Sequence, residues 1–442
     1  MKFRKILFSF IKFSKKPLIR KFIVSSLVIV VAFYFILKIY SNFITLDLSL
    51  LNNKYDSNEI ILFDETNKNT KDKLQEYFQL NERISKQASL KKVSFNYYYG
   101  GGYGNRLCSF ISSLLIGILT DSQTVIVNWY DIKDYIDIPI SNLFIESENF
   151  LTMTYNYFSY IFRTYYVFGK EAWNPNKNIN MLMNTNIPMN GFLRYVFYRA
   201  DCLFMEICAN KKYFQKLFYY NLVSNETIHK ALSSINENKS DDDKKEKLFR
   251  VGFEVGGNLL NKIWKPNGDI QKEIDFYLKK EFKSNYVIGI QLRYGREEDA
   301  IFLNDTADTA KFIECAFQIE KDYYRQNTSR KKIKWFVASD SEKNLNKVLA
   351  KFPDKAFSSK GKLAHIAYYS EGYRRTIIDI ELLSKCDELI ITGGSTFGFI
   401  VSMKMLKLPY FINGYSTMKK CSRTMLSQPP VRPNGDKFSA FF

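Results

Sequence analysis

Two short stretches combine glycines, hydroxyl groups and an arginine in a way that suits a phosphate group. In the first, Gly393-Gly394 interrupts an apolar run from Leu389 to Ile391, and Ser395-Thr396 stands directly before Phe397 to Lys404. This order predicts a buried strand, a tight turn and the capped start of a helix. Such a start offers backbone N–H groups and the positive end of the helix dipole to an anion. The same motif is also typical of a helix cap without a ligand.

The second stretch places an arginine at the end of a predicted strand. Val287 to Leu292 has the apolar character of a buried strand, and Arg293 follows it. A further strand is predicted from Lys334 to Ser339, and Asp340 follows that one. In an open parallel sheet, residues that follow the strands face the ligand crevice. We therefore expect three strands to direct polar groups at one crevice, with Arg293 as its permanent cation.

Length and composition limit the class of protein. The chain has 442 residues, of which 46% are hydrophobic and 16% aromatic, enough for two domains with apolar cores. Its net charge of +19 is not accompanied by a zinc-finger, homeodomain or RRM-like pattern, so we do not expect nucleic acid as a partner. Asp241 to Asp243 belongs to a polar run with no preceding strand, which favours an exposed charged insertion over a metal-binding DxD element. No Cys/His cluster indicates zinc.

The amino-terminal region has the pattern of a membrane anchor. Residues 1–21 contain eight lysines and arginines and no acidic residue, and Phe22 to Leu37 is apolar and uncharged. A span of about 20 such residues crosses a bilayer, and its basic flank stays in the cytosol. No small-residue cleavage site follows, so we expect a cytosolic tail at 1–21 and a signal anchor at 22–40. The sequence thus predicts a type II, single-pass membrane protein of the Golgi.

Residues after the anchor are then expected in the lumen, with a stem at 41–92. Six cysteines could pair in that oxidising compartment, in a connectivity that the sequence leaves open. Four sequons for N-glycosylation acquire meaning there, at Asn225, Asn238, Asn304 and Asn327.

A third motif lies near the start of the predicted folded part. A glycine-rich turn within Tyr97 to Leu107 precedes a helical pattern from Cys108 to Leu119, and a strand pattern follows from Thr124 to Trp129. This succession is typical of the beginning of an α/β lobe. The glycines could let the backbone approach a ligand, or they could form only a sharp turn.

Several blocks, taken in their order along the chain, resemble the plant-type xyloglucan α-1,2-fucosyltransferases of the wider fucosyltransferase superfamily. The resemblance extends from about Val93 to Cys421, with a poorly matching middle from about Asn149 to Lys247. The blocks are Gly101-Gly-Tyr-Gly-Asn-Arg-Leu107 with Leu115 to Asp121, Ile288-Gly-Ile-Gln-Leu-Arg293, Glu371-Gly-Tyr373, and Leu382-Leu-Ser384 through Ser395-Thr-Phe-Gly398.

The resemblance implies an α/β, GT-B-like fold of two facing Rossmann-like lobes behind the transmembrane helix. The amino-terminal lobe at 93–280 would shape the acceptor side, the lobe at 281–414 would hold GDP-fucose, and a tail would occupy 415–442. It also implies an inverting reaction without a metal or a cofactor besides the donor GDP-fucose.

Roles for single residues follow from the same resemblance. Arg293 would contact the β-phosphate as a catalytic residue, and Ser395, Thr396 and Phe397 would hold the pyrophosphate. Asp340 would read guanine, and Gln291 stands where several relatives carry histidine. Asn105, the second catalytic candidate, would orient the acceptor or the sugar, and the donor-binding set also includes Gly102, Gly104 and Arg106. In the tail after Lys420, a proline replaces a cysteine that is usual in the family, which puts a disulfide there in doubt.

The function expected from these observations is transfer of L-fucose to a glycan hydroxyl, forming an α-1,2 linkage to a galactose-type acceptor. One alternative is a fucosyltransferase that acts on protein hydroxyls or forms another linkage. A second is a catalytically silent lumenal protein that binds glycans or nucleotides. The acceptor, any catalytic base and the oligomeric state stay open.

Overall fold

A computed structural model describes the parts of the chain that carry the predicted lobes. The described residues are 73–86, 93–97, 102–121, 123–127, 129–145, 195–197, 204–236, 241–294, 305–326, 331–363, 372–412 and 421–423. They all lie within one compact unit, Lys68–Phe442. The predicted anchor at 22–40 lies outside the described residues. Within the described ranges, no helix combines the length and the apolar character that a membrane crossing needs.

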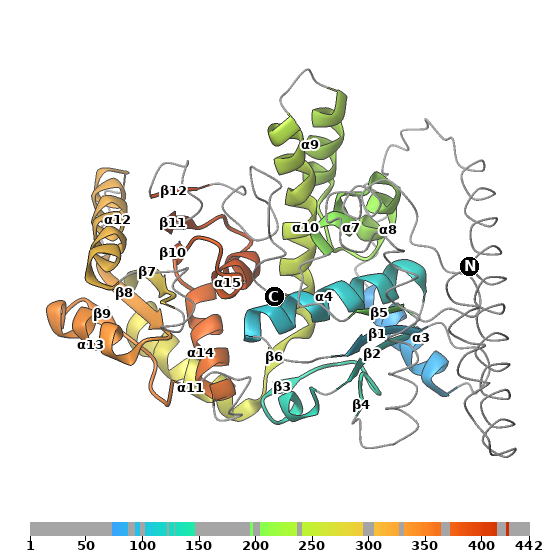
Figure 1. Ribbon diagram of the computed structural model, residues 1–442, viewed down its shortest axis with the longest axis horizontal. Coiled ribbons are helices and arrows are strands. Elements are labelled where there is room, and N and C mark those ends of the chain that lie inside the picture. The colour runs from blue at the N-terminus through green and yellow to red at the C-terminus, as the bar shows by residue number, and fades with distance from the viewer. Residues whose placement is uncertain are drawn as a thin grey trace, which may run out of the picture. The chain divides into compact units, whose positions relative to one another are not determined.

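The larger sheet has six strands in the order β12-β11-β10-β7-β8-β9, and only β12 runs antiparallel to its neighbour (Figure 1). Three of its strands confirm the strands predicted around Ile288, Phe336 and Ile390. The strands are β7 (Asn285–Leu292), β8 (Lys332–Ser339), β9 (Ala356–Phe357), β10 (Glu388–Thr392), β11 (Tyr410–Ile412) and β12 (Ser422–Arg423).

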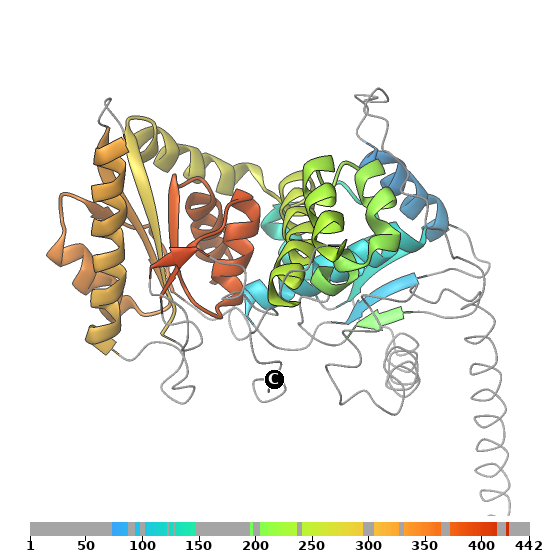
Figure 2. The same ribbon diagram turned by 90° about the horizontal axis from the view of Figure 1, so that it is seen from above.

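Helices cover both faces of this sheet, which explains why its central strands are apolar on both sides (Figure 2). On one face, Ile288 and Ile290 belong to the same buried cluster as Phe312 of α12. On the other face, Gly289 lies against Leu383 at the end of α14. The helices are α11 (Gly268–Tyr277) with its π-helical extension η5 (Leu278–Phe282), α12 (Asp305–Gln326), α13 (Glu342–Lys351), α14 (Gly372–Ser384) and α15 (Thr396–Met405).

The smaller sheet has the order β4-β2-β1-β5, with all its pairs parallel. Its strands are β1 (Val93–Tyr97), β2 (Gln123–Val127), β4 (Phe144–Ile145) and β5 (Tyr195–Phe197). Helix α4 (Tyr103–Thr120) connects β1 to β2 and begins five residues before the predicted start at Cys108. After β2, η2 (Tyr130–Asp134) leads to β3 (Ile136–Asp137), which pairs with β6 (Lys265–Pro266).

Part of the predicted stem is folded against the smaller sheet. Helix α3 (Leu74–Lys86) buries Tyr77 and Asn81, and both side chains bond to Thr124 at the start of β2. The Tyr77 hydroxyl lies 2.6 Å from Thr124 Oγ1, and Asn81 Oδ1 accepts the Thr124 N–H at 2.7 Å. The folded part of the chain therefore extends into the segment predicted at 41–92.

Five described helical segments follow β5 along the chain and precede β6. The longest of them, α10, packs closely on its neighbours at its glycines. The charged residues from Asp241 onward, predicted as an exposed insertion, form the beginning of helix α10. A Cβ atom on Gly257 of α10 would lie 2.1 Å from the carbonyl oxygen of Met403 in α15. The helices are α7 (Phe204–Ala209), η4 (Lys211–Tyr213), α8 (Phe214–Tyr219), α9 (Asn225–Asn236) and α10 (Asp241–Ile263).

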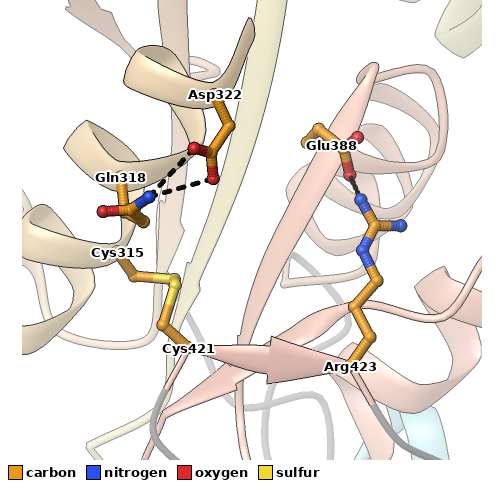
Figure 3. The surroundings of a disulfide bond; sticks show 6 residues. All are labelled: Cys315, Gln318, Asp322, Glu388, Cys421 and Arg423. Carbon is orange, nitrogen blue, oxygen red and sulfur yellow. Dashed lines mark hydrogen bonds and ion pairs between the residues drawn. A yellow bond between two sulfur atoms is a disulfide. The ribbon is translucent and has the colours of Figure 1, made fainter. Parts of the chain in front are cut away.

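A disulfide between Cys315 and Cys421 joins α12 to the start of β12 (Figure 3). Beside it, Arg423 forms an ion pair with Glu388 of β10. The cysteine of the tail is thus bonded to a residue 106 positions earlier, which the sequence could not indicate. Cys108 is also disulfide-bonded, whereas Cys208 and Cys386 are buried.

We predict that Gly257→Ala destabilises the protein because the added methyl group would overlap the backbone of α15. Overpacking of this kind costs about 1–3 kcal/mol of unfolding free energy. Thermal unfolding of the purified protein measures the effect. Gly268→Ala is the matched control, since a Cβ atom there meets no atom within 4 Å. Equal melting temperatures for the two variants would contradict the packing described for Gly257.

Candidate functional site

The carboxyl ends of three neighbouring strands bring polar residues together. Arg293 follows β7, and its backbone N–H donates to Oγ1 of Thr392, the last residue of β10, at 2.9 Å. Asp340 follows β8, and its carboxylate forms an ion pair with the Arg293 guanidinium. The two side chains are 28% and 25% exposed, so the pair is accessible to a ligand. The structure thus assembles the polar groups predicted at the ends of these strands.

The turn after β10 has the geometry predicted for it. Gly394 has a φ of +81°, a conformation that residues with a side chain rarely adopt. Ser395 then caps α15, since its Oγ accepts the Gly398 N–H at 3.4 Å. Thr396 and Phe397, the first residues of the helix, are partly exposed. Their backbone N–H groups precede the first hydrogen bonds within the helix, which suits an anion.

Gln291 holds this turn from inside the protein. Its side chain is 4% exposed, and its Oε1 accepts the Thr392 N–H at 3.2 Å. Its Nε2 donates to Ser395 Oγ at 3.4 Å. The structure places this predicted ligand contact in hydrogen bonds that link the end of β10 to the start of α15.

The first turns of α4 and α15 touch at Gly104. A Cβ atom on this residue would lie 2.7 Å from the backbone nitrogen of Phe397 and 2.8 Å from the carbonyl carbon of Thr396. Helix packing therefore explains the glycine at 104. Gly102 caps α4 without a side-chain hydrogen bond, so the first N–H groups of a second helix lie beside those of α15 and receive no hydrogen bond from their cap residue. Two positive helix ends at one place favour negative charge.

Arg106, predicted to bind the donor, is buried in an aromatic cluster. Its guanidinium is directed at Trp129 and Tyr373, with 5.8 Å to each ring centroid, and it donates to the Tyr373 hydroxyl. The indole N–H of Trp129 donates to the same hydroxyl at 3.1 Å. Burial raises the pKa of Tyr373, with a smaller lowering by Arg106. The structure thus separates Arg106, bound to Tyr373, from Arg293, bound to Asp340.

Asn105 offers a hydrogen-bond acceptor next to the contact between α4 and α15. Its Oδ1 is enclosed and has no hydrogen-bond partner among the residues that the structure describes. An enclosed carbonyl oxygen without a donor is costly, at about 1–3 kcal/mol. A hydroxyl group of a ligand could supply that donor.

Three residues at the site were not predicted from the sequence. Thr392 ends a strand, the same signal that singled out Arg293. Trp129 also ends a predicted strand, and Tyr373 lies within one of the blocks of the resemblance. Position relative to the strands could have indicated the first two, whereas the contact of Tyr373 depends on tertiary packing.

Of the four predicted N-glycosylation sites, only Asn225 lies within the described residues. Asn225 begins α9 and is partly buried, and Asn238, Asn304 and Asn327 lie outside the described residues. Among the residues with described positions, no three or more His, Cys, Asp or Glu side chains are grouped so as to hold a metal ion.

A buried acid lies on α14, two turns after Tyr373. Asp379 is 5% exposed, accepts a hydrogen bond from Ser359 and lies 3.7 Å from Nε of Arg375. Burial raises the pKa of the Asp379 carboxyl to about 6, although Arg375 and Ser359 lower it in part.

We predict that Tyr373→Phe lowers the unfolding free energy because it removes the acceptor shared by Arg106 and Trp129. Losing a buried partner of this kind costs about 1–3 kcal/mol. Denaturant unfolding of the purified protein measures this cost. Tyr219→Phe is the control, since the Tyr219 hydroxyl bonds to Glu76 at an exposed position. An equal change in both variants would argue against a special role for the buried hydroxyl.

We also predict that Asp379 makes stability depend on pH. Because the folded chain holds this proton more tightly than the unfolded chain, the contribution is fully present below the unfolded pKa near 3.8 and is lost as the pH rises through about 6. Between about pH 4 and about pH 7 the unfolding free energy of the wild type should fall by about 2 kcal/mol relative to Asp379→Asn. Parallel stability curves for the two proteins would refute this.

Part of the chain is similar to known proteins. Residues 248–407 match the family model of NodZ, nodulation protein Z. Over 154 residues the chain is 33% identical to nodulation protein Z of Bradyrhizobium diazoefficiens, covering 32% of this chain and 40% of the relative. The chain therefore matches less than half the length of this curated relative.

Solved structures extend the comparison beyond residues 248–407. A variant of Arabidopsis thaliana FUT1 in complex with GDP has a TM-score of 0.50 and 12% identity, covering 76% of this chain and 78% of that chain. The NodZ α-1,6-fucosyltransferase co-crystallised with GDP has a TM-score of 0.39 and 16% identity, covering 70% and 92%. The described part of the chain thus has an α/β fold similar to that of fucosyltransferases of GT-B type, as the sequence predicts.

Proposed function

We propose that the chain is an α-L-fucosyltransferase that moves fucose from GDP-fucose to a hydroxyl group of a glycan. The observation that carries this proposal is the position of Arg293, hydrogen-bonded to Thr392 three residues before the capped start of α15. A permanent cation beside a helix N-terminus is suited to a diphosphate.

The comparisons support the same donor. The segment that matches the NodZ family, 248–407, contains β7, β8, β10 and α15, and so contains Arg293, Asp340 and Ser395. NodZ is described as an α-1,6-fucosyltransferase, and the FUT1 structure holds GDP.

The chemistry of the reaction fits these groups. Fucosyl transfer breaks the bond between the sugar C1 and a phosphate oxygen through an oxocarbenium-like state, and negative charge grows on the departing GDP. Arg293 and the N–H groups at the start of α15 would stabilise that charge where it develops. Ser395 fixes the direction of those N–H groups by capping the helix. Because an arginine and a helix N-terminus already offer positive charge to the diphosphate, the proposal includes no divalent metal and no further cofactor.

Asn105 is the proposed contact to the hydroxyl groups. Its enclosed Oδ1 could accept a hydrogen bond from the acceptor or from fucose and so orient the sugar. Nucleophilic attack by the acceptor oxygen on C1 from the face opposite to GDP would invert the configuration. The proposal needs no strong base, because the hydroxyl proton can leave late in the reaction, to solvent water or to a phosphate oxygen of the departing GDP.

The finer parts of the proposal concern the linkage and the location. We propose an α-1,2 linkage to a galactose-type acceptor; an α-1,6 linkage, as described for NodZ, and transfer to protein hydroxyls are the competing outcomes.

The basic flank at 1–21 and the apolar run from Phe22 to Leu37 support a type II, single-pass protein of the Golgi membrane. The Cys315–Cys421 disulfide agrees with a folded domain in the oxidising lumen.

The proposal predicts release of GDP from GDP-fucose only when a suitable acceptor is present. The assay uses the purified full-length protein with EDTA and a panel of galactosides, chitin-type oligosaccharides and peptides, and the product linkage is read by NMR. Release with galactosides and an α-1,2 product would support the proposal in full. No release with any acceptor, although GDP binds, would favour the silent binding protein.

The role of Arg293 is tested in the same assay. Arg293→Ala should lower turnover by about 10²–10³-fold, as expected when one group that stabilises a developing charge is removed. Arg374→Ala is the matched control, since this arginine of α14 pairs with Glu273 of α11. Full GDP affinity and turnover in Arg293→Ala would refute the assignment of the donor site.

A further inference from the structure

The carboxylate of Asp340 is engaged on both of its oxygens. Oδ2 pairs with the Arg293 guanidinium, and Oδ1 accepts the Tyr294 N–H at 2.9 Å. Strand register explains this contact, because Leu292 at the end of β7 lies opposite Ser339 at the end of β8. Arg293 directly follows β7, and Asp340 directly follows β8. The pairing is therefore built into the sheet.

A carboxylate that recognises guanine normally uses both oxygens, one for the ring N–H and one for the 2-amino group. In Asp340 both oxygens instead face the residues that follow β7. The charge on Arg293, rather than a base, is the partner that this geometry provides. The structure therefore favours a role different from the guanine contact expected from the sequence.

Arg293 is held at two points as a result. Its backbone N–H is fixed by Thr392, whose own N–H and hydroxyl bond to Gln291, and its guanidinium is fixed by Asp340. A side chain with a fixed orientation needs no reorganisation when charge develops on a ligand. Arginine has five N–H donors, so a guanidinium that bonds to a carboxylate can also bind a diphosphate.

We propose that Asp340 is a positioning residue that orients Arg293 for fucosyl transfer and does not read the base. This inference rests on the proposed function, since it assigns a role within the same donor site. Asp340 also places a negative charge near the expected diphosphate. Removing that charge weakens repulsion of GDP at the same time as it loosens Arg293, so binding changes less than turnover.

The test compares Asp340→Asn with the wild type in the full-length protein. We expect turnover of GDP-fucose to fall about tenfold, as for a misplaced catalytic group. Dissociation constants for GDP and for inosine diphosphate, which lacks the 2-amino group of guanine, should keep the wild-type ratio within a factor of about two. Asp387→Asn is the matched control, because Asp387 accepts the backbone N–H of Val287 near the amino end of β7, away from the carboxyl ends of the strands.

A double-mutant cycle asks whether Asp340 acts through Arg293. In an Arg293→Lys background, which lacks the planar fork, Asp340→Asn should change turnover by no more than a factor of about two. A tenfold effect that persists in that background would overturn the proposal. Asp340→Glu, which keeps the charge but displaces it, provides a second variant if Asp340→Asn does not fold, and turnover should again fall with the nucleotide ratio unchanged.

The failures are distinguishable. If Asp340→Asn reduces the affinity for GDP much more than the affinity for inosine diphosphate, which retains the ring N–H but lacks the 2-amino group, Asp340 reads the base and only this inference is wrong. Wild-type turnover in both Asp340 variants would also overturn it alone. A wild-type protein that neither binds GDP nor uses GDP-fucose would overturn the proposed function, and this inference with it.

Discussion

The arrangement of the candidate site depends on one close contact between backbones, that of α4 with the first turn of α15. Helix α4 follows the first strand of the four-stranded sheet, whereas α15 follows a strand of the six-stranded sheet. Only a residue without a side chain at 104 lets the two helix starts meet. Near its other end, α15 touches α10 at Gly257 through the carbonyl group of Met403. A helix fixed near both ends presents its first N–H groups in a constant direction, which is the condition for an electrostatic site that works without rearrangement.

The aromatic cluster around Arg106 reinforces that contact. Tyr373 of α14 receives hydrogen bonds from Arg106 of α4 and from Trp129, which lies just beyond β2. The ring of Tyr103 packs edge-on against those of Trp129 and Tyr373. A buried cation among aromatic rings is stabilised by their faces. Arg106 therefore stabilises the packing of α4 against α14, whereas Arg293 remains accessible. The division of labour between Arg106 and Arg293 therefore follows from their surroundings and not from their chemistry.

The sequence predicts local features of this protein well and long-range contacts poorly. The strand ending at Thr392, its glycine turn and the Ser395 cap are recognisable because each depends on neighbouring residues. The pairing of Arg293 with Asp340 depends on β7 lying beside β8 in register, which no local pattern states. Gly104 looks the same in a sharp turn, a ligand loop or a helix contact, and only the position of Phe397 distinguishes them. The polar run after Asp241 lacks apolar periodicity, so its helix could not be predicted from pattern alone.

The disulfide between Cys315 and Cys421 makes part of the chain a covalent ring. The ring encloses β8, β10 and α15, and with them Asp340 and Ser395, whereas Arg293 lies outside it. Closing a loop of about 100 residues removes roughly 4–5 kcal/mol of conformational freedom from the unfolded chain in the entropic account. Ring closure must wait until Cys421 has been synthesised, after every strand of the larger sheet except β12. Until then the strands of the larger sheet are held together by non-covalent contacts alone, and a chain that stops before Cys421 could never acquire this covalent link.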